Sequence, residues 1–183
     1  KLHVYINGTQ LQEEIMKIKI YCIGKIKEQY LKLGIEEYKK RISAYSNIEI
    51  IEVGDEPVKD NPSKAEIELV KDKECAKVLK LLKPNDYLIT LDLTKHQPNS
   101  YEFAEFLSKS LEKGGSQISF VIGGSYGLSN EIKQRANDTI CLSNLTFLHQ
   151  MTRLILLEQI YRAFKINNNE VYHKWLSTKN LKI

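Results

Sequence analysis

The sequence contains few of the residues that mark disulfide-rich, metal-binding or membrane-spanning proteins. Its three cysteines, Cys22, Cys75 and Cys141, lie 53 and 66 residues apart and form no CxxC or Cys/His pair, which argues against a structural zinc site. An odd number of widely spaced cysteines predicts reduced, mostly buried thiols in a cytosolic protein. The longest aliphatic run, residues 154–157, is far shorter than the ~20 residues that span a bilayer. We therefore expect no membrane segment and no bound metal.

A large excess of charge of either sign is also missing. The chain has 27 basic and 23 acidic residues, a net charge of +4, and only four of the basic residues are arginine. The longest run of like charge is 39–41. Such mild, dispersed charge permits a nucleic-acid partner without requiring one. Residues 1–15 lack the apolar core of a secretory signal, which agrees with the cytoplasmic location expected from the cysteines.

The 183 residues are typical of one domain, since domains commonly have ~150 residues. The segment 1–15 differs from the rest, because 6–9 (Ile-Asn-Gly-Thr) is a hairpin-turn signal between short β-prone pieces. Met16 then opens a new alternating run. We interpret 1–15 as an appended or unusual N-terminal extension, 16–174 as the domain, and 175–183, which lacks clear periodicity, as a C-terminal extension.

Strand and helix patterns alternate along the domain. Alternating or continuous apolar runs predict strands at 18–23, 48–53, 86–93, 118–122 and 139–142. Apolar residues at helical spacing predict helices over 31–45, 63–81, 100–113, 129–137 and 149–166. Ser100 is expected to cap the third helix, and Gly114-Gly115 to end it. This order predicts an α/β protein with a mainly parallel sheet flanked by helices.

Three loops that follow strands are candidate binding sites, because open α/β sheets bind ligands at the carboxyl ends of their strands. They are residues 91–93, 123–127 and 142–147. The second loop, Gly-Gly-Ser-Tyr-Gly, is either a ligand cradle or a tight turn without a ligand. Its spacing matches neither the dinucleotide-binding fingerprint nor the phosphate loop. The third loop could hold a planar ring, although its composition alone favours an ordinary loop with Leu and Phe side chains anchored in the core.

Charged and titratable residues near these loops leave further alternatives open. His149 and Arg153 share a helix face, either to contact an anion or nucleotide or as a capping histidine and a surface arginine. Asp92 either orients a ligand or caps a turn. The run 172–174, Tyr-His-Lys, suits a stacked base and a phosphate, or it belongs to a solvated tail.

Together these segments resemble the RlmH family of SPOUT-class methyltransferases. The resemblance is carried by Met16 to Gly24, by 122–124 (Ile-Gly-Gly) with 127–128 (Gly-Leu), and by 142–147 followed by His149 and Arg153. It continues through 158–163 (Glu-Gln-Ile-Tyr-Arg-Ala) and the terminal 172–174. It covers about residues 16–174. Family members usually end at the position of 174, so 1–15 and 175–183 depart from the pattern.

The resemblance implies methylation of N3 of a pseudouridine in 23S large-subunit rRNA, within the assembled ribosome, with S-adenosylmethionine as methyl donor. It also implies an α/β fold with a C-terminal trefoil knot, which composition cannot show, and a homodimer with each active site near the subunit interface. Tyr172 and His173 match tail residues that the family uses near the target base. The positions that match donor-contacting residues are Leu91, Gly123, Leu142, Ser143, Asn144, Leu145, Thr146 and Phe147.

The chemistry suggests catalytic roles for Arg153 and for His173. A sulfonium methyl donor is already electrophilic, so the enzyme has to orient the imide, exclude water and stabilise the negative charge that develops on it. We expect Arg153 to provide that stabilisation or to hold a phosphate. His173 is expected to accept the imide proton, because imidazole titrates in the useful range.

Three rival functions remain. A SPOUT enzyme with another RNA target, such as tRNA, is disfavoured by the Tyr-His-Lys ending and by the short chain. A flavodoxin-like nucleotide-binding domain would need a phosphate loop after the first strand, and residues 24–27 (Gly-Lys-Ile-Lys) provide no Ser/Thr cluster or glycine run. A non-catalytic dimer that binds RNA would retain affinity for the donor without turnover.

Overall fold

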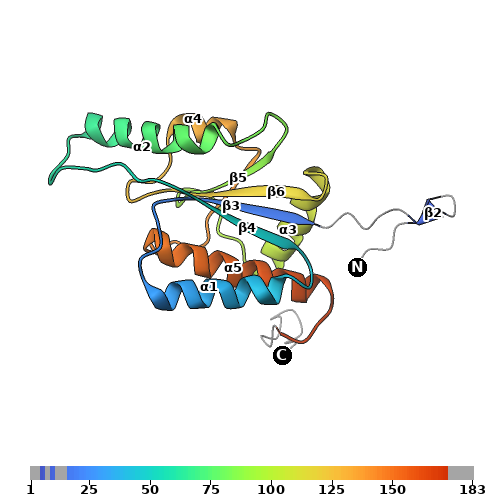
Figure 1. The fold of residues 1–183 in the computed structure, drawn as a ribbon. Helices are drawn as coiled ribbons and strands as arrows, with labels where there is room; N and C mark the ends of the chain where they lie inside the picture. The colour runs from blue at the N-terminus through green and yellow to red at the C-terminus, as the bar shows by residue number, and fades with distance from the viewer. Residues whose placement is uncertain (1–4, 7–8, 11–15, 173–183) are drawn as a thin grey trace, which may run out of the picture.

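The computed structural model describes residues 5–6, 9–10 and 16–172 of the chain (Figure 1). Two short strands, β1 (Tyr5–Ile6) and β2 (Thr9–Gln10), pair antiparallel on either side of the predicted hairpin turn. The domain then alternates strands and helices in the predicted order. Its elements are β3 (Lys17–Ile23), α1 (Gln29–Ile42), β4 (Asn47–Val53), α2 (Lys64–Leu79), β5 (Tyr87–Leu91), α3 (Ser100–Lys113), β6 (Gln117–Ile122), α4 (Asn130–Arg135), β7 (Asp138–Ile140) and α5 (His149–Asn167).

The five strands β3 to β7 form one sheet in the order β4-β3-β6-β5-β7, and every neighbouring pair is parallel. In this register Ile20 of β3 lies opposite Ile50 of β4 on one side and Phe120 of β6 on the other. The predicted α/β fold with a parallel sheet is confirmed. Counted along the chain, the strand order is 2-1-4-3-5. A flavodoxin-like sheet has the order 2-1-3-4-5, so the flavodoxin-like alternative is wrong.

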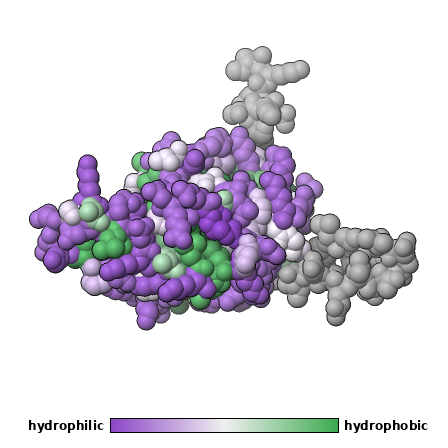
Figure 2. All heavy atoms as spheres, turned by 90° about the horizontal axis from the view of Figure 1, so that it is seen from above, coloured by the Kyte–Doolittle hydropathy of each residue, from purple (hydrophilic) through white to green (hydrophobic). Residues whose placement is uncertain are grey.

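Helices cover both faces of the sheet (Figure 1). On one face α5 contacts both α1 and α3, and on the other face α2 contacts α4. Neighbouring strand residues point to opposite faces, so Ile20 belongs to the core under α5, while the adjacent Tyr21 belongs to the core under α2 and α4. Seen from above, the outer surface is mostly hydrophilic, with hydrophobic residues in separate patches (Figure 2).

Side-chain caps mark where α2, α3 and α4 begin. Ser63 and Glu66 form a capping box at the start of α2, next to the predicted start of this helix at residue 63. At the start of α3 the cap is Asn99, whose side chain accepts hydrogen bonds from the backbone of Tyr101 and Glu102. The predicted cap, Ser100, is instead the first helical residue. Asn99 satisfies the free N–H groups because its carboxamide oxygen precedes the first turn.

Among the residues that the structure describes, no helix combines the length and apolar character that a membrane span needs. The three cysteines are free, and all of them are buried, as predicted.

Candidate functional site

A pocket of about 600 Å³ lies at the carboxyl ends of β5, β6 and β7, next to the start of α5. The three predicted loops line it together, because the ends of parallel strands meet at one edge of the sheet. Seven of the eight residues expected to contact a donor are among its lining residues: Leu91, Gly123, Leu142, Ser143, Leu145, Thr146 and Phe147. The eighth, Asn144, is exposed and outside the lining, and its backbone N–H donates to Gln97 Oε1 at 2.9 Å.

The glycine loop is both a tight turn and a wall of the pocket. The backbone N–H of Gly127 donates to the carbonyl of Gly124 at 3.1 Å, and Gly127 has a φ of 86°, a conformation that favours glycine. A Cβ on Gly123 would lie 2.7 Å from the carbonyl carbon of Gly127. The loop therefore presents bare backbone to the pocket, which is the geometry that a ligand cradle requires.

The loop 142–147 differs from an ordinary anchored loop. Leu145 is 71% exposed, while Leu142 packs against the core and Phe147 is half-buried. The hydroxyl of Ser143 accepts a hydrogen bond from the backbone N–H of Leu145 at 3.0 Å. The thiol of Cys141 donates to the carbonyl of Ser143 at 2.9 Å. The loop is thus fixed by local hydrogen bonds, and a large apolar side chain stands free at the rim of the pocket.

Arg153 is inside the protein, so the alternative of a surface arginine is wrong. Its side chain is 0% exposed and forms an ion pair with Glu52 of β4 at 2.6 Å. The guanidinium also donates to the carbonyls of Ile23 at 3.1 Å and Gly24 at 2.7 Å. Arg153 is not among the residues that line the pocket. In this geometry it joins α5 to the ends of β3 and β4, and its predicted contact with an anion or a reacting imide stays a prediction.

His149 lines the pocket at the first turn of α5. Its Nε2 lies 3.3 Å from the position a Cβ on Gly24 would take, which fixes the imidazole beside the end of β3. Burial and the charge of Arg153 lower the pKa of His149, against an opposing effect of Asp55. A neutral imidazole at this place offers the pocket a hydrogen-bond acceptor or donor rather than a charge.

Asp92 has the structural role of a turn residue. Its Oδ1 accepts hydrogen bonds from the backbone and side chain of Thr94, both at 3.0 Å, and its Oδ2 pairs with Lys133 at 2.7 Å. The turn ends β5 at Leu91, two residues before the predicted end. Asp92 lines the pocket, but both of its carboxylate oxygens already have partners.

In a single chain, Tyr172 lies well away from the pocket of that same chain. Its hydroxyl hydrogen-bonds Glu158 at 3.2 Å, and Arg162 lies over its ring at 4.9 Å. At ~1.5 Å per helical residue, Glu158 and Arg162 lie roughly 9 and 15 Å along α5 from Thr152 at the pocket edge. Burial, together with Tyr38 and Glu158, raises the pKa of Tyr172, so its hydroxyl stays protonated. The predicted His173 lies outside the described residues.

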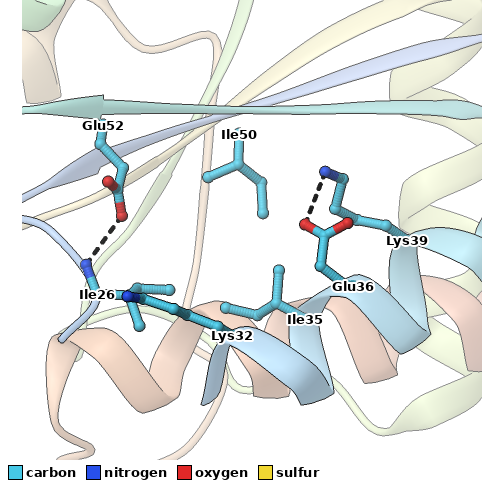
Figure 3. A pocket seen from close by; sticks show the side chains of 7 residues that line it. All are labelled: Ile26, Lys32, Ile35, Glu36, Lys39, Ile50 and Glu52. Carbon is cyan, nitrogen blue, oxygen red and sulfur yellow. Dashed lines mark hydrogen bonds and ion pairs between the residues drawn. The ribbon is translucent and has the colours of Figure 1, made fainter. Parts of the chain in front are cut away.

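A second hollow, of about 370 Å³, lies between α1 and β4 (Figure 3). Three of its charged side chains have partners: Lys39 pairs with Glu36 at 3.0 Å, and Glu52 accepts the backbone N–H of Ile26 at 3.0 Å. The larger pocket at the strand ends is therefore the better candidate site, because it has free backbone and apolar walls. Within the described residues no group of three or more His, Cys, Asp or Glu side chains could hold a metal.

Sequence reasoning missed two carboxylates near the pocket. Glu52 holds Arg153, and Glu74 of α2 lies behind the glycine loop, where a Cβ on Gly124 would meet its Oε2 at 2.7 Å. For Glu52 the only available signal was its position near the end of a predicted strand. Glu74 falls inside a predicted helix, and nothing in the sequence marks it.

Comparison with known proteins identifies the family to which the chain belongs. The family described as "Predicted SPOUT methyltransferase" matches residues 16–173. Proteins named ribosomal RNA large subunit methyltransferase H match 87% of this chain and 100% of their own length. That of Clostridioides difficile is 52% identical, that of Clostridium novyi 50% and that of Exiguobacterium sp. 49%. Lpg2936 of Legionella pneumophila, assigned as a methyltransferase and solved with bound SAM, has a TM-score of 0.44 at 11% identity over 85% of this chain and 70% of that chain, a similarity too weak to bear on function. By its family match and its full-length relatives, the chain belongs to the SPOUT methyltransferase family.

Proposed function

We propose that this protein transfers a methyl group from S-adenosylmethionine to N3 of a pseudouridine in 23S large-subunit rRNA, acting on the assembled ribosome. The observation that carries the proposal is the identity of about 50% to proteins named ribosomal RNA large subunit methyltransferase H over their whole length. A ribosomal substrate agrees with the cytoplasmic location expected from the free cysteines.

The pocket at the strand ends fits the donor. Its walls are the bare backbone of the glycine loop and the apolar side chains of Leu91, Leu142 and Phe147, which suit a planar adenine and a ribose. The donor supplies an electrophilic methyl group on its sulfonium. The trefoil knot belongs to the same proposal: the segment after β7 lies against the 92–99 loop, where the N–H of Cys141 donates to the carbonyl of His96 at 3.1 Å.

The chain's own residues have to bring the imide to the methyl group and remove its proton. In the transfer the N3–C bond forms as the C–S bond breaks, and the imide proton goes to a base, for which we propose His173. Tyr172, whose hydroxyl stays protonated, orients the target base. The Arg153 charge stabilises the deprotonated imide only if the guanidinium leaves Glu52. While that pair is intact, Arg153 joins α5 to the ends of β3 and β4.

The distance between these groups supports a homodimer as part of the proposal. Tyr172 contacts residues of α5 that lie roughly 9 and 15 Å along the helix from the pocket edge. The tail of a second subunit is therefore the simplest source of the catalytic residues at each pocket. The apolar rim supports such a contact, because Leu145, Leu148, Leu93 and Tyr126 line the pocket while 71%, 58%, 54% and 37% exposed. Exposed large apolar groups around a pocket are typical of a surface that another chain covers.

The proposal is tested by transfer of labelled methyl from S-adenosylmethionine to ribosomes that lack the modification, with free rRNA and tRNA alongside. We expect label on assembled ribosomes alone, at N3 of one pseudouridine. Label on tRNA or on free rRNA only would assign another RNA target. An absence of label on all three, from protein that binds the donor, would favour the non-catalytic RNA-binding alternative.

A further inference from the structure

A buried carboxyl group lies behind the glycine loop, outside the pocket itself. Glu74 of α2 is 3% exposed. Its Oε1 accepts the backbone N–H of Glu56 at 2.9 Å, while its Oε2 is buried and has no hydrogen-bond partner among the described residues. Nearly all buried polar atoms in proteins have a partner, so an unpaired carboxyl oxygen at this place requires an explanation.

The unpaired oxygen faces the wall of the pocket. A Cβ on Gly124 would lie 2.7 Å from Glu74 Oε2 and 3.0 Å from Ile23 Cγ2. Gly124 also lines the pocket. At Gly124, therefore, a single layer of backbone separates the ligand space from the Glu74 carboxyl group. Any movement of this layer when a ligand binds changes the surroundings of Oε2.

The charged groups around Glu74 favour its protonated form. Burial has the largest effect and raises the pKa of Glu74, and the negative charges of Asp55 and Glu56 raise it further. The hydrogen bond from the Glu56 backbone and the charge of Lys77 lower it, but Lys77 Nζ is already bonded to the Gly54 carbonyl and to Glu56. A protonated carboxyl group can donate a hydrogen bond to a backbone carbonyl of the loop.

We propose that Glu74 is a positioning residue of the donor pocket: in the ligand-bound protein its Oε2 donates a hydrogen bond to the backbone of the 123–127 loop and so holds the loop conformation that binds S-adenosylmethionine. The proposal rests on the proposed function for the identity of the ligand. Among the described residues Oε2 has no partner in the ligand-free protein, and binding gives it one. Part of the affinity for the donor then comes from a side chain that the donor does not touch.

The test compares Glu74→Leu with Glu74→Gln in the full-length chain, by calorimetric titration with S-adenosylmethionine. Leu removes the polar atoms, including the acceptor of the Glu56 N–H, so we expect affinity to fall about tenfold, which corresponds to ~1.4 kcal/mol. Urea unfolding of the same variant measures its change in stability separately. Gln accepts from Glu56 through its oxygen and donates to the loop through its nitrogen, so we expect wild-type affinity. Glu68, exposed on the same helix and paired with Lys71, gives the controls Glu68→Leu and Glu68→Gln, which should bind like wild type.

The pH dependence adds a readout that a purely structural role would not produce. The pKa of folded Glu74 is raised, so the stability due to its protonated form is present below the unfolded pKa and lost as pH rises through the folded pKa. Donor affinity should fall in the same range for wild type and stay level for Glu74→Gln. His149 also titrates at the pocket, but it is present in both proteins, so their difference isolates Glu74.

Three results would overturn the proposal. The first is wild-type affinity in Glu74→Leu, and the second is an equal loss of affinity in Glu74→Gln and Glu74→Leu at every pH. The third applies if Glu74→Leu fails to fold: parallel pH profiles of wild type and Glu74→Gln then reject the role. If wild type itself does not bind S-adenosylmethionine, the proposed function fails as well, which separates the two conclusions.

Discussion

The ion pair between Arg153 and Glu52 should be a major source of stability, and Glu52→Gln tests this directly. The amide has nearly the shape of the carboxylate, and its oxygen can still accept from Arg153 and from the backbone N–H of Ile26. The substitution therefore removes the negative charge while leaving the packing and most hydrogen bonds in place. What is measured is the free energy of leaving the Arg153 charge unpaired in the interior.

The magnitude follows from the burial of the two partners. Breaking a fully buried pair by removing one charge costs ~3–5 kcal/mol. The Arg153 side chain is 0% exposed, but the Glu52 side chain is 33% exposed, so solvent screens part of the interaction. The carbonyls of Ile23 and Gly24 also continue to accept from the guanidinium. We expect a loss of about 2 kcal/mol in the free energy of unfolding.

Urea unfolding near neutral pH measures this loss. It is done at one fixed protein concentration, because the unfolding of the proposed dimer would depend on concentration. The matched control is Glu36→Gln, which removes the same charge from an exposed pair: Glu36 and Lys39 are 69% and 32% exposed. Such a pair contributes ~0–1 kcal/mol. Equal losses in the two variants would refute the argument that Arg153 depends on Glu52 as its buried counter-charge.

Two further predictions concern the ligands. Gly123→Ala should weaken S-adenosylmethionine binding by roughly tenfold or more in a calorimetric titration, because the new Cβ would lie 2.7 Å from Gly127. The control Gly54→Ala should bind normally, because its Cβ would have only Lys77 Nζ, at 3.8 Å, within contact range. The double variant Lys25→Glu/Lys27→Glu should slow methylation of ribosomes by roughly tenfold with unchanged donor affinity. Both side chains are exposed just after β3, where Gly24 lies against His149 of the pocket, and they can contact rRNA phosphates. Lys80→Glu, exposed at the C-terminal end of α2, should have no such effect, and an equal effect would reject a local contact.

The order of strands and helices could be predicted because its signals are local. Apolar alternation, capping residues and the glycine pair after α3 lie within a few positions of the elements that they define. The small errors are local as well: Asn99 caps α3 in place of Ser100, and the Asp92 turn ends β5 early. The strand order was not predictable in this way, since nothing near β5 in the sequence determines that β6 lies between it and β3.

The difference between local and distant signals also explains why the pocket could be predicted from the sequence and the charged contacts behind it could not. Loops that follow parallel strands have to meet at one edge of the sheet, so their residues could be assigned to one site without knowing the strand order. Arg153 and Glu52 are 101 positions apart, and only the completed fold brings them together. A charged residue in a helix is usually solvated, and nothing in the sequence shows that Arg153 is buried. The residues that line the pocket are thus the predictable part of this site. The buried charged contacts behind it, the Arg153–Glu52 pair and the Glu74 carboxyl group behind the glycine loop, become visible only in the completed fold.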